Sequence, residues 1–172
     1  MRILRGRWAD TDLVSPGRRV RPTAEAVRDA WLNWIEDDLE GARVLELFAG
    51  TGALGLEALS RGAASVDFVE SGAPALHALK ANVAKLRVKK GATRIFKRDA
   101  IPYCEALPEG RYDLCLADPP FGSRMADRIV RRWLEVPYAT VLAVETAADH
   151  ARLPGKGRRR TFDASSVTVY RR

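Results

Sequence analysis

A glycine-rich stretch at residues 50–55 constrains the fold more than any other part of this sequence. It reads Gly-Thr-Gly-Ala-Leu-Gly and has the spacing G-x-G-x-x-G. An apolar, strand-like run at 44–48 precedes it, and the helix-like residues 53–61 overlap its end and run beyond it. Glycines between a strand and a helix let the backbone turn sharply and approach a ligand closely. The order predicts a nucleotide-binding unit, with a purely structural tight turn as the alternative.

The rest of the chain continues this alternation. Further strands are predicted at 65–70, 93–96, 112–117, 140–144, 158–162 and 167–170, and further helices at 73–86 and 125–134. Apolar strands that are each followed by a helix indicate a parallel sheet covered on both faces. Only four residues separate the last two strands, which is too few for a crossover helix, so this pair should be antiparallel. The expected fold is α/β and Rossmann-like, with a mostly parallel seven-stranded sheet.

The N-terminal segment differs from the rest of the chain. Residues 1–22 are rich in arginine and are broken by glycine and proline, a composition typical of a hairpin or an extended arm. Residues 23–172 are expected to form a single domain, because domains commonly have about 100–200 residues. No apolar run is long enough for a signal peptide or a membrane span. With only two cysteines and no zinc motif, we expect a soluble, cytoplasmic protein without a metal.

The net charge is positive, because 29 Lys and Arg residues outnumber 22 Asp and Glu residues. Such a surplus favours a polyanionic partner such as nucleic acid, although solubility alone can explain it. We expect arginines near both ends of the chain, among them Arg5, Arg7 and Arg158, to flank the carboxyl edge of the sheet and bind phosphates. A solvated edge is the alternative for the arginines of the strand 158–162, since neighbouring strand residues point to opposite faces. Unpaired RNA is the favoured target, because its bases enter a pocket at lower cost than paired ones.

Two carboxylates flank the glycine-rich stretch. Glu70 ends the next strand, 20 residues after Gly50, and can accept both ribose hydroxyls of a nucleotide, although a solvated strand end would look the same. Glu46 suits a ligand that carries an ammonium and a sulfonium group, and it would repel a pyrophosphate. This favours S-adenosylmethionine over a nicotinamide dinucleotide. Alternatively, Glu46 only accepts hydrogen bonds from the amides of the loop.

A second motif, Asp118-Pro119-Pro120-Phe121, directly follows a predicted strand. Prolines lack the N–H that a central strand needs, so the strand must end here and Asp118 should lie at the carboxyl edge of the sheet. The Asp118 carboxylate and the Pro119 carbonyl are two rigid acceptors that match the two hydrogens of an exocyclic amine, and Phe121 offers a face for a base to stack on. Such acceptors would stabilise the positive charge that develops during methyl transfer. The alternative is a structural turn with Phe121 in the core.

A different chemistry, attack on a pyrimidine carbon, would need a cysteine nucleophile in this corner. Cys115 lies in an apolar strand and Cys104 in a helix, and both are expected to be core residues.

Together with Arg21-Pro22-Thr23, residues 47–63 and Val69-Glu70, this motif resembles the bacterial small-subunit rRNA guanine-N2 methyltransferase family. The resemblance spans nearly the whole chain. It implies a class I S-adenosylmethionine-dependent fold and methylation of N2 of one guanine in 16S rRNA, guanine 966 in the usual numbering. The implied partner is 16S rRNA or an assembly intermediate of the small subunit, and the expected state is a monomer.

The resemblance also implies roles for individual residues. Cofactor-binding candidates are Glu46, Phe48, Ala49, Gly50, Thr51, Gly52, Glu70 and Asp99. Asp118 to Phe121 would hold the target base, and Arg21 and Thr23 look like the family's leader motif near cofactor and substrate. Asp99 and Thr23 are equally good candidates for helix N-caps.

Three other functions fit part of the pattern. The Asp-Pro-Pro-Phe motif also suits adenine-N6 methyltransferases, but a chain this short has no room for the large target-recognition domain that a DNA enzyme would need. A nicotinamide-dependent oxidoreductase shares the glycine-rich loop. A non-catalytic RNA-binding module would share the basic charge.

Overall fold

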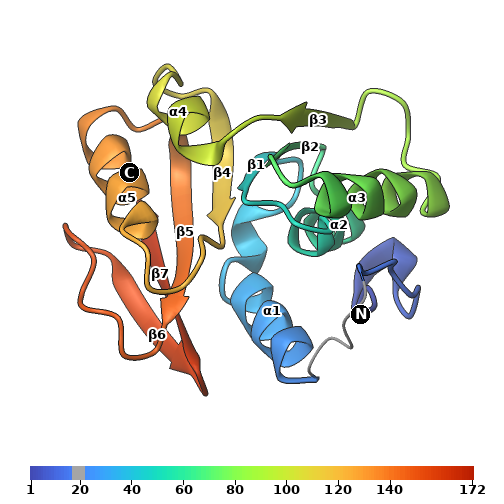
Figure 1. Cartoon of the computed structure of the whole chain (residues 1–172), viewed down its shortest axis with the longest axis horizontal. Helices are drawn as coiled ribbons and strands as arrows, with labels where there is room; N and C mark the ends of the chain where they lie inside the picture. The colour runs from blue at the N-terminus through green and yellow to red at the C-terminus, as the bar shows by residue number, and fades with distance from the viewer. Residues whose placement is uncertain (17–21) are drawn as a thin grey trace.

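The computed structural model describes residues 1–16 and 22–172, and for residues 22 and 23 only the backbone. A seven-stranded sheet with the strand order β3-β2-β1-β4-β5-β7-β6 forms its centre (Figure 1). The strands are β1 Arg43–Leu47, β2 Ser65–Glu70, β3 Thr93–Lys97, β4 Tyr112–Ala117, β5 Ala139–Ala147, β6 Arg158–Phe162 and β7 Ser165–Arg171. The first five are mutually parallel, whereas β7 runs antiparallel to both β5 and β6. The predicted fold, including its antiparallel C-terminal pair, is confirmed.

Helices cover both faces of the sheet. They are α1 Pro22–Trp34, α2 Ala53–Ser60, α3 Ala73–Lys85, α4 Ala100–Glu105 and α5 Met125–Glu135. Successive strand residues point to opposite faces, so Val44 packs in one core with residues of α1, α2 and α3, and Leu45 in another with residues of α4 and α5. Cys104 and Cys115 are buried in the second core, as expected. None of the helices in the described ranges is both long and apolar enough to cross a membrane.

The expected N-terminal hairpin is present in residues 1–14. The Ile3 amide donates to the Thr11 carbonyl at 3.0 Å, and the Leu13 amide donates to the Met1 carbonyl at 2.7 Å. A short 3₁₀ helix, Gly6–Trp8, lies at its turn. Because Ile3 and Leu13 are buried in the core that α2 also enters, the hairpin packs against the body of the protein.

A fully buried carboxylate on α2, Glu57, fastens the hairpin in place. Its two oxygens accept hydrogen bonds from the backbone amides of Leu4 and Arg5, each at 2.9 Å. The guanidinium groups of Arg28 and Arg61 lie 3.4 and 2.8 Å from the same carboxylate. Glu57 is therefore compensated by two cations and two amides, as a buried charge must be.

The strand order fixes where a ligand can bind. The connection from β1 leads outward to β2 and β3, and the later strands β4 and β5 are added on the other side of β1. In sheets of this kind, ligands bind at the carboxyl ends of the strands where the order reverses. This point lies between β1 and β4, the strands that precede the glycine-rich loop and the Asp-Pro-Pro-Phe corner.

Candidate active site

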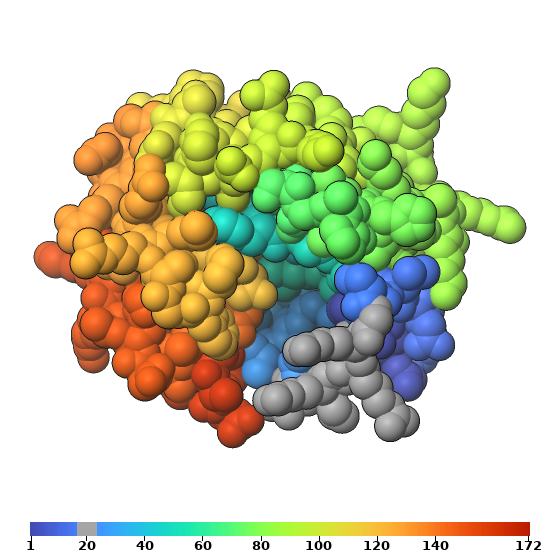
Figure 2. Space-filling model, in the orientation of Figure 1, coloured from blue at the N-terminus to red at the C-terminus, as the bar shows by residue number. Residues whose placement is uncertain are grey.

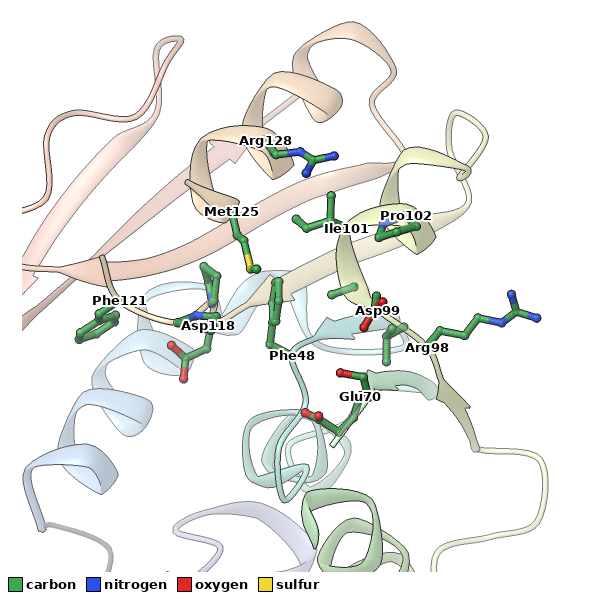
Figure 3. Close-up of a pocket in the computed structure, with 15 residues that line it drawn as sticks. Phe48, Glu70, Arg98, Asp99, Ile101, Pro102, Asp118, Phe121, Met125 and Arg128 are labelled. Atoms are coloured by element: carbon green, nitrogen blue, oxygen red, sulfur yellow. The ribbon is translucent and has the colours of Figure 1, made fainter. Parts of the chain in front are cut away.

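Two adjoining cavities open at this edge of the sheet, and Figure 2 shows the surface hollowed there. The first has a volume of about 830 Å³ and is lined by Glu70 and Asp99, among others (Figure 3). The second, of about 450 Å³, is lined by Glu46 and by the first residues of the glycine-rich loop. Phe48, Asp118 and Phe121 line both cavities, so the corner after β4 faces the two together.

Glycine is required at different positions of the loop for different structural reasons. Gly52 has φ +76°, and a Cβ there would lie 2.3 Å from Leu79 Cδ1. A Cβ on Gly55 would lie 2.4 Å from Glu46 Oε2, and the Gly55 amide donates to that same oxygen at 2.8 Å. The glycines at 52 and 55 thus serve tight packing and leave Glu46 in place, whereas a Cβ on Gly50 would meet nothing within 4 Å. Gly50 therefore faces open space, as expected where a ligand approaches the backbone.

Glu70 is held at the mouth of the loop. Its Oε2 accepts a hydrogen bond from the Gly50 amide at 2.8 Å, and its Oε1 accepts one from the Gly72 amide at 2.6 Å. The alternative, in which Glu70 is only a solvated residue at the end of its strand, is therefore wrong, because the carboxylate is half-buried and held by two hydrogen bonds. Each carboxylate oxygen can accept more than one hydrogen bond, so both keep capacity for a ligand hydroxyl.

Glu46 is buried, and its Oε2 accepts from Gly55, which belongs to α2. Burial, with smaller contributions from the negative charges of Asp118 and Glu70, raises the pKa of Glu46 to about 8, although the Gly55 amide and Arg28 oppose the shift. A cation bound in the second cavity would relieve this concentration of carboxylates. A ligand with sulfonium and ammonium groups therefore fits the residues present, and a pyrophosphate does not.

The corner after β4 is built as the sequence indicates. β4 ends at Ala117, Asp118 follows at the pocket surface, and the Ser123 hydroxyl donates to the Pro120 carbonyl at 2.7 Å. Phe121 is 53% exposed, so its assignment to the core is wrong and its ring is accessible for stacking. The low-dielectric surroundings of the recessed corner, and then the negative charge of Glu145, raise the pKa of Asp118.

Asp99 stands at the N-cap position of α4, but its side chain makes no capping hydrogen bond there. The capping role considered for Asp99 is thus wrong. The side chain is exposed and lines the first cavity near Glu70 (Figure 3).

The basic substrate candidates do not gather at this site, which corrects the expectation that they flank the carboxyl edge. Arg5 Nε donates to Asp29 at 2.7 Å, and the backbone beside Arg5 and Arg7 is bonded to Ser60, the last residue of α2. This end of α2 is the one opposite the glycine-rich loop. Arg7 stacks on its neighbour Trp8 at 4.0 Å. The hairpin places these arginines here because its backbone, not its charges, binds α2.

The arginines of β6 divide between the two faces of the sheet, as strand alternation requires. Arg158 pairs in register with Val169, four positions before Phe162 at the carboxyl end of β6, so it is also remote from the site. Arg159 donates to the Ser166 hydroxyl and to the Ala148 carbonyl. Arg21 and the side chain of Thr23 lie outside the described residues.

Several residues of the site escaped the sequence analysis. They are Glu145 and the β6–β7 turn in the second cavity, and Arg98 and Arg128 in the first. Arg98 could have been found from the sequence, because it directly follows a predicted strand and precedes Asp99. Arg128 and the β6–β7 turn carry no local motif that would indicate a site. Phe48, which was expected at the site, lines both cavities and has φ +59°, a costly conformation for a residue with a side chain and one that is enriched at functional sites.

The family follows from comparison with known proteins. A family model described as conserved hypothetical protein 95 matches residues 1–169. The chain belongs to this family. The curated proteins that are similar to this chain include the Ribosomal RNA small subunit methyltransferase D of Haemophilus influenzae. The two are 30% identical over 87% of this chain and 80% of that protein. The protein of the same name from Escherichia coli K12 is 37% identical over 70% of this chain, a match that spans 60% of the relative. The resemblance to small-subunit rRNA methyltransferases is confirmed.

Solved structures agree with the family assignment. The Escherichia coli protein yhhF superposes with a TM-score of 0.85 and 27% identity over 100% of this chain and 97% of the other. A SAM-dependent methyltransferase from Agrobacterium tumefaciens gives a TM-score of 0.56 and 25% identity over 77% of this chain and 47% of the other. The class I methyltransferase fold is therefore confirmed for this family member.

Proposed function

We propose that this protein methylates the exocyclic N2 amine of a guanine in 16S rRNA, guanine 966, with S-adenosylmethionine as the methyl donor. The observation that carries the proposal is the Asp118 corner, which lines both cavities. One ligand in the cofactor cavities and one base at the corner would meet at the same side chain. The names of the Haemophilus influenzae and Escherichia coli relatives support the choice of rRNA as substrate.

The chain's own residues suit direct transfer without a covalent enzyme intermediate. The Asp118 carboxylate and the Pro119 carbonyl accept the two N2 hydrogens, and Phe121 stacks on the base. S-adenosylmethionine, when bound, supplies an electrophilic methyl group. N2 forms a bond to the methyl carbon as the bond between that carbon and sulfur breaks, and N2 loses one proton, which the Asp118 carboxylate accepts. In-line positioning supplies the rest of the rate enhancement.

The cofactor residues are assigned within the same proposal. Glu46 and residues 48–52 hold the methionine end, Glu70 the ribose and Asp99 the adenine amine. Arg98 and Arg128, which line the first cavity, are better placed for RNA phosphates than Arg5, Arg7 or Arg158. The enzyme acts as a monomer in the cytoplasm, with residues 1–22 as an arm and residues 23–172 as the methyltransferase domain. Arg21 and Thr23 remain candidates for substrate contact.

The test is methylation of defined substrates by the purified protein. Small subunits and 16S rRNA from cells that lack the protein are incubated with S-adenosylmethionine, and the RNA is digested and examined by nucleoside mass spectrometry. We expect N2-methylguanosine in the oligonucleotide that contains position 966. N6-methyladenosine in place of N2-methylguanosine would overturn the assignment of the base, and the absence of any methylation would overturn the enzyme.

The pH dependence of kcat/KM should reflect the carboxylates at the corner. Asp118 must be ionised to accept the amine hydrogens, and its pKa is raised by its surroundings and by Glu145, while Glu46 also faces the same cavity. Activity should therefore fall as the pH is lowered, and the fall should begin above the ordinary Asp pKa of about 3.9. The measurement is a pH profile of kcat/KM on small subunits. A profile that stays flat down to the ordinary range would contradict this role of Asp118.

A further inference from the structure

Glu145 is the acidic residue of the site that the sequence motifs did not indicate. It lies near the end of β5, where the register pairs Ala117 of β4 with Val144. Asp118 directly follows β4 and Glu145 is the next residue of β5, so the two come after paired positions, and continued alternation directs both to the same face of the sheet. Both line the second cavity, together with Phe121.

The surroundings of Glu145 leave it available to a ligand. It is half-buried, and no Lys or Arg side chain of the described ranges forms an ion pair with it. Ser165, the first residue of β7, also lines this cavity. Burial raises the pKa of the Glu145 carboxyl, and the buried Ser165 hydroxyl lies near enough to oppose that shift. The negative charge of Glu145 raises the pKa of Asp118, in keeping with the neighbouring positions that the strand register gives the two residues. A carboxylate without a cationic partner among the described residues thus stands beside the proposed base site.

We propose that Glu145 determines the choice of base, by accepting a hydrogen bond from N1–H of the target guanine while Asp118 and Pro119 bind the N2 amine. This inference rests on the proposed function and names the residue that selects guanine within it. Guanine presents N1–H and N2–H₂ as neighbouring donors on one edge, and two adjacent carboxylates are complementary to them. Hydrogen bonds to charged acceptors are the stronger ones.

The same arrangement rejects adenine. The acceptors at Asp118 and Pro119 would suit the N6 amine of adenine equally well, so they cannot select the base by themselves. Adenine N1 carries a lone pair and no hydrogen, so in the same position it would face the Glu145 carboxylate with two acceptors opposed. A buried polar group left without its partner costs far more than a mismatch in an apolar pocket, and discrimination of this kind can be large.

The test exchanges the acceptor at position 145 for a group that can also donate. Glu145→Gln and wild-type protein are compared on RNA with guanine or 2-aminopurine at the target, since 2-aminopurine keeps the amine but has an unprotonated N1. Wild type should strongly prefer guanine. We expect Glu145→Gln to lower kcat/KM on guanine by about 10- to 100-fold, the size expected for a charged hydrogen bond, and to raise the relative rate on 2-aminopurine. The glutamine N–H₂ can donate to N1 of 2-aminopurine.

Controls separate recognition from a damaged pocket. Asp113→Asn makes the same chemical change near the start of β4, where Asp113 pairs with Arg43, and should leave the ratio of the two rates unchanged. Affinity for S-adenosylhomocysteine, measured by calorimetry, should be the same in wild type and Glu145→Gln. Glu145→Ala removes the acceptor and adds no donor, so it should lose rate on guanine and, because the two opposed acceptors are gone, narrow the ratio of the rates on guanine and 2-aminopurine; this variant decides the matter if the glutamine variant does not fold.

The outcomes distinguish the inference from the proposed function. Suppose that wild type methylates guanine N2, and that Glu145→Gln either lowers the rates on guanine and on 2-aminopurine by the same factor or leaves both unchanged. The role of Glu145 is then wrong and the proposed function stands. If wild type forms no N2-methylguanosine, both fail. A change in the ratio with unchanged cofactor affinity supports the inference.

Discussion

Replacing Asp118 with alanine is expected to lower kcat for methyl transfer by about 100- to 1000-fold, because loss of one group that stabilises transition-state charge has effects of this size. The carboxylate directly follows β4, precedes two prolines that restrict the backbone, and lines both cavities. Glu46 and Glu70 are untouched by the change, so the affinity for S-adenosylhomocysteine should change little. Single-turnover methylation of small subunits and calorimetry measure the two quantities separately.

A matched control lies on the same strand. Asp113→Ala removes an aspartate near the amino end of β4, where it makes a largely exposed ion pair with Arg43 at 3.0 Å. Its kcat should stay close to that of wild type. If Asp118→Ala retained full activity, or lost it only through weaker cofactor binding, the amine-binding role of the corner would be wrong.

Replacing Glu57 with alanine should lower the free energy of unfolding by about 3–5 kcal/mol, the cost of leaving buried charges without their partner. The change would remove the carboxylate partner of Arg28 and one of the two carboxylate partners of Arg61, and both guanidinium groups are almost completely buried. It would also remove the acceptors for the amides of Leu4 and Arg5, and so weaken the attachment of the hairpin to α2. Urea unfolding followed by circular dichroism measures the effect.

The comparison is Glu109→Ala, which removes an exposed partner of Arg172. Exposed ion pairs contribute less than about 1 kcal/mol, so this variant should unfold close to wild type. Equal unfolding free energies for the two variants would show that the buried network does not hold the hairpin.

The parts of the site that the sequence predicted are those with local causes. The glycine-rich loop depends on backbone conformations at Gly50 and Gly52, and the end of β4 depends on the missing amides of Pro119 and Pro120. Both causes act within a few residues, so the residue order alone indicates them. The alternation of apolar segments likewise predicted the sheet, although β5 extends to Ala147, beyond the predicted end at 144.

What the sequence did not predict depends on contacts between distant segments. Glu145 is one acidic residue in an apolar strand, and only the register of β5 against β4 brings it beside Asp118. Arg5 belongs to a basic segment that resembles a nucleic-acid-binding arm, but its amide donates to Glu57 and its carbonyl accepts from Ser60, and in this position its side chain pairs with Asp29. Charge composition cannot indicate such a partner.

The sharing of Phe48, Asp118 and Phe121 by the two cavities has a thermodynamic consequence. In the proposed function the cofactor spans both cavities and the target base lies at the corner, so each ligand would set the positions of side chains that the other also contacts. If bound S-adenosylhomocysteine changes the dissociation constant for RNA by some factor, RNA must change the dissociation constant for S-adenosylhomocysteine by the same factor, because the two routes to the ternary complex have the same total free energy.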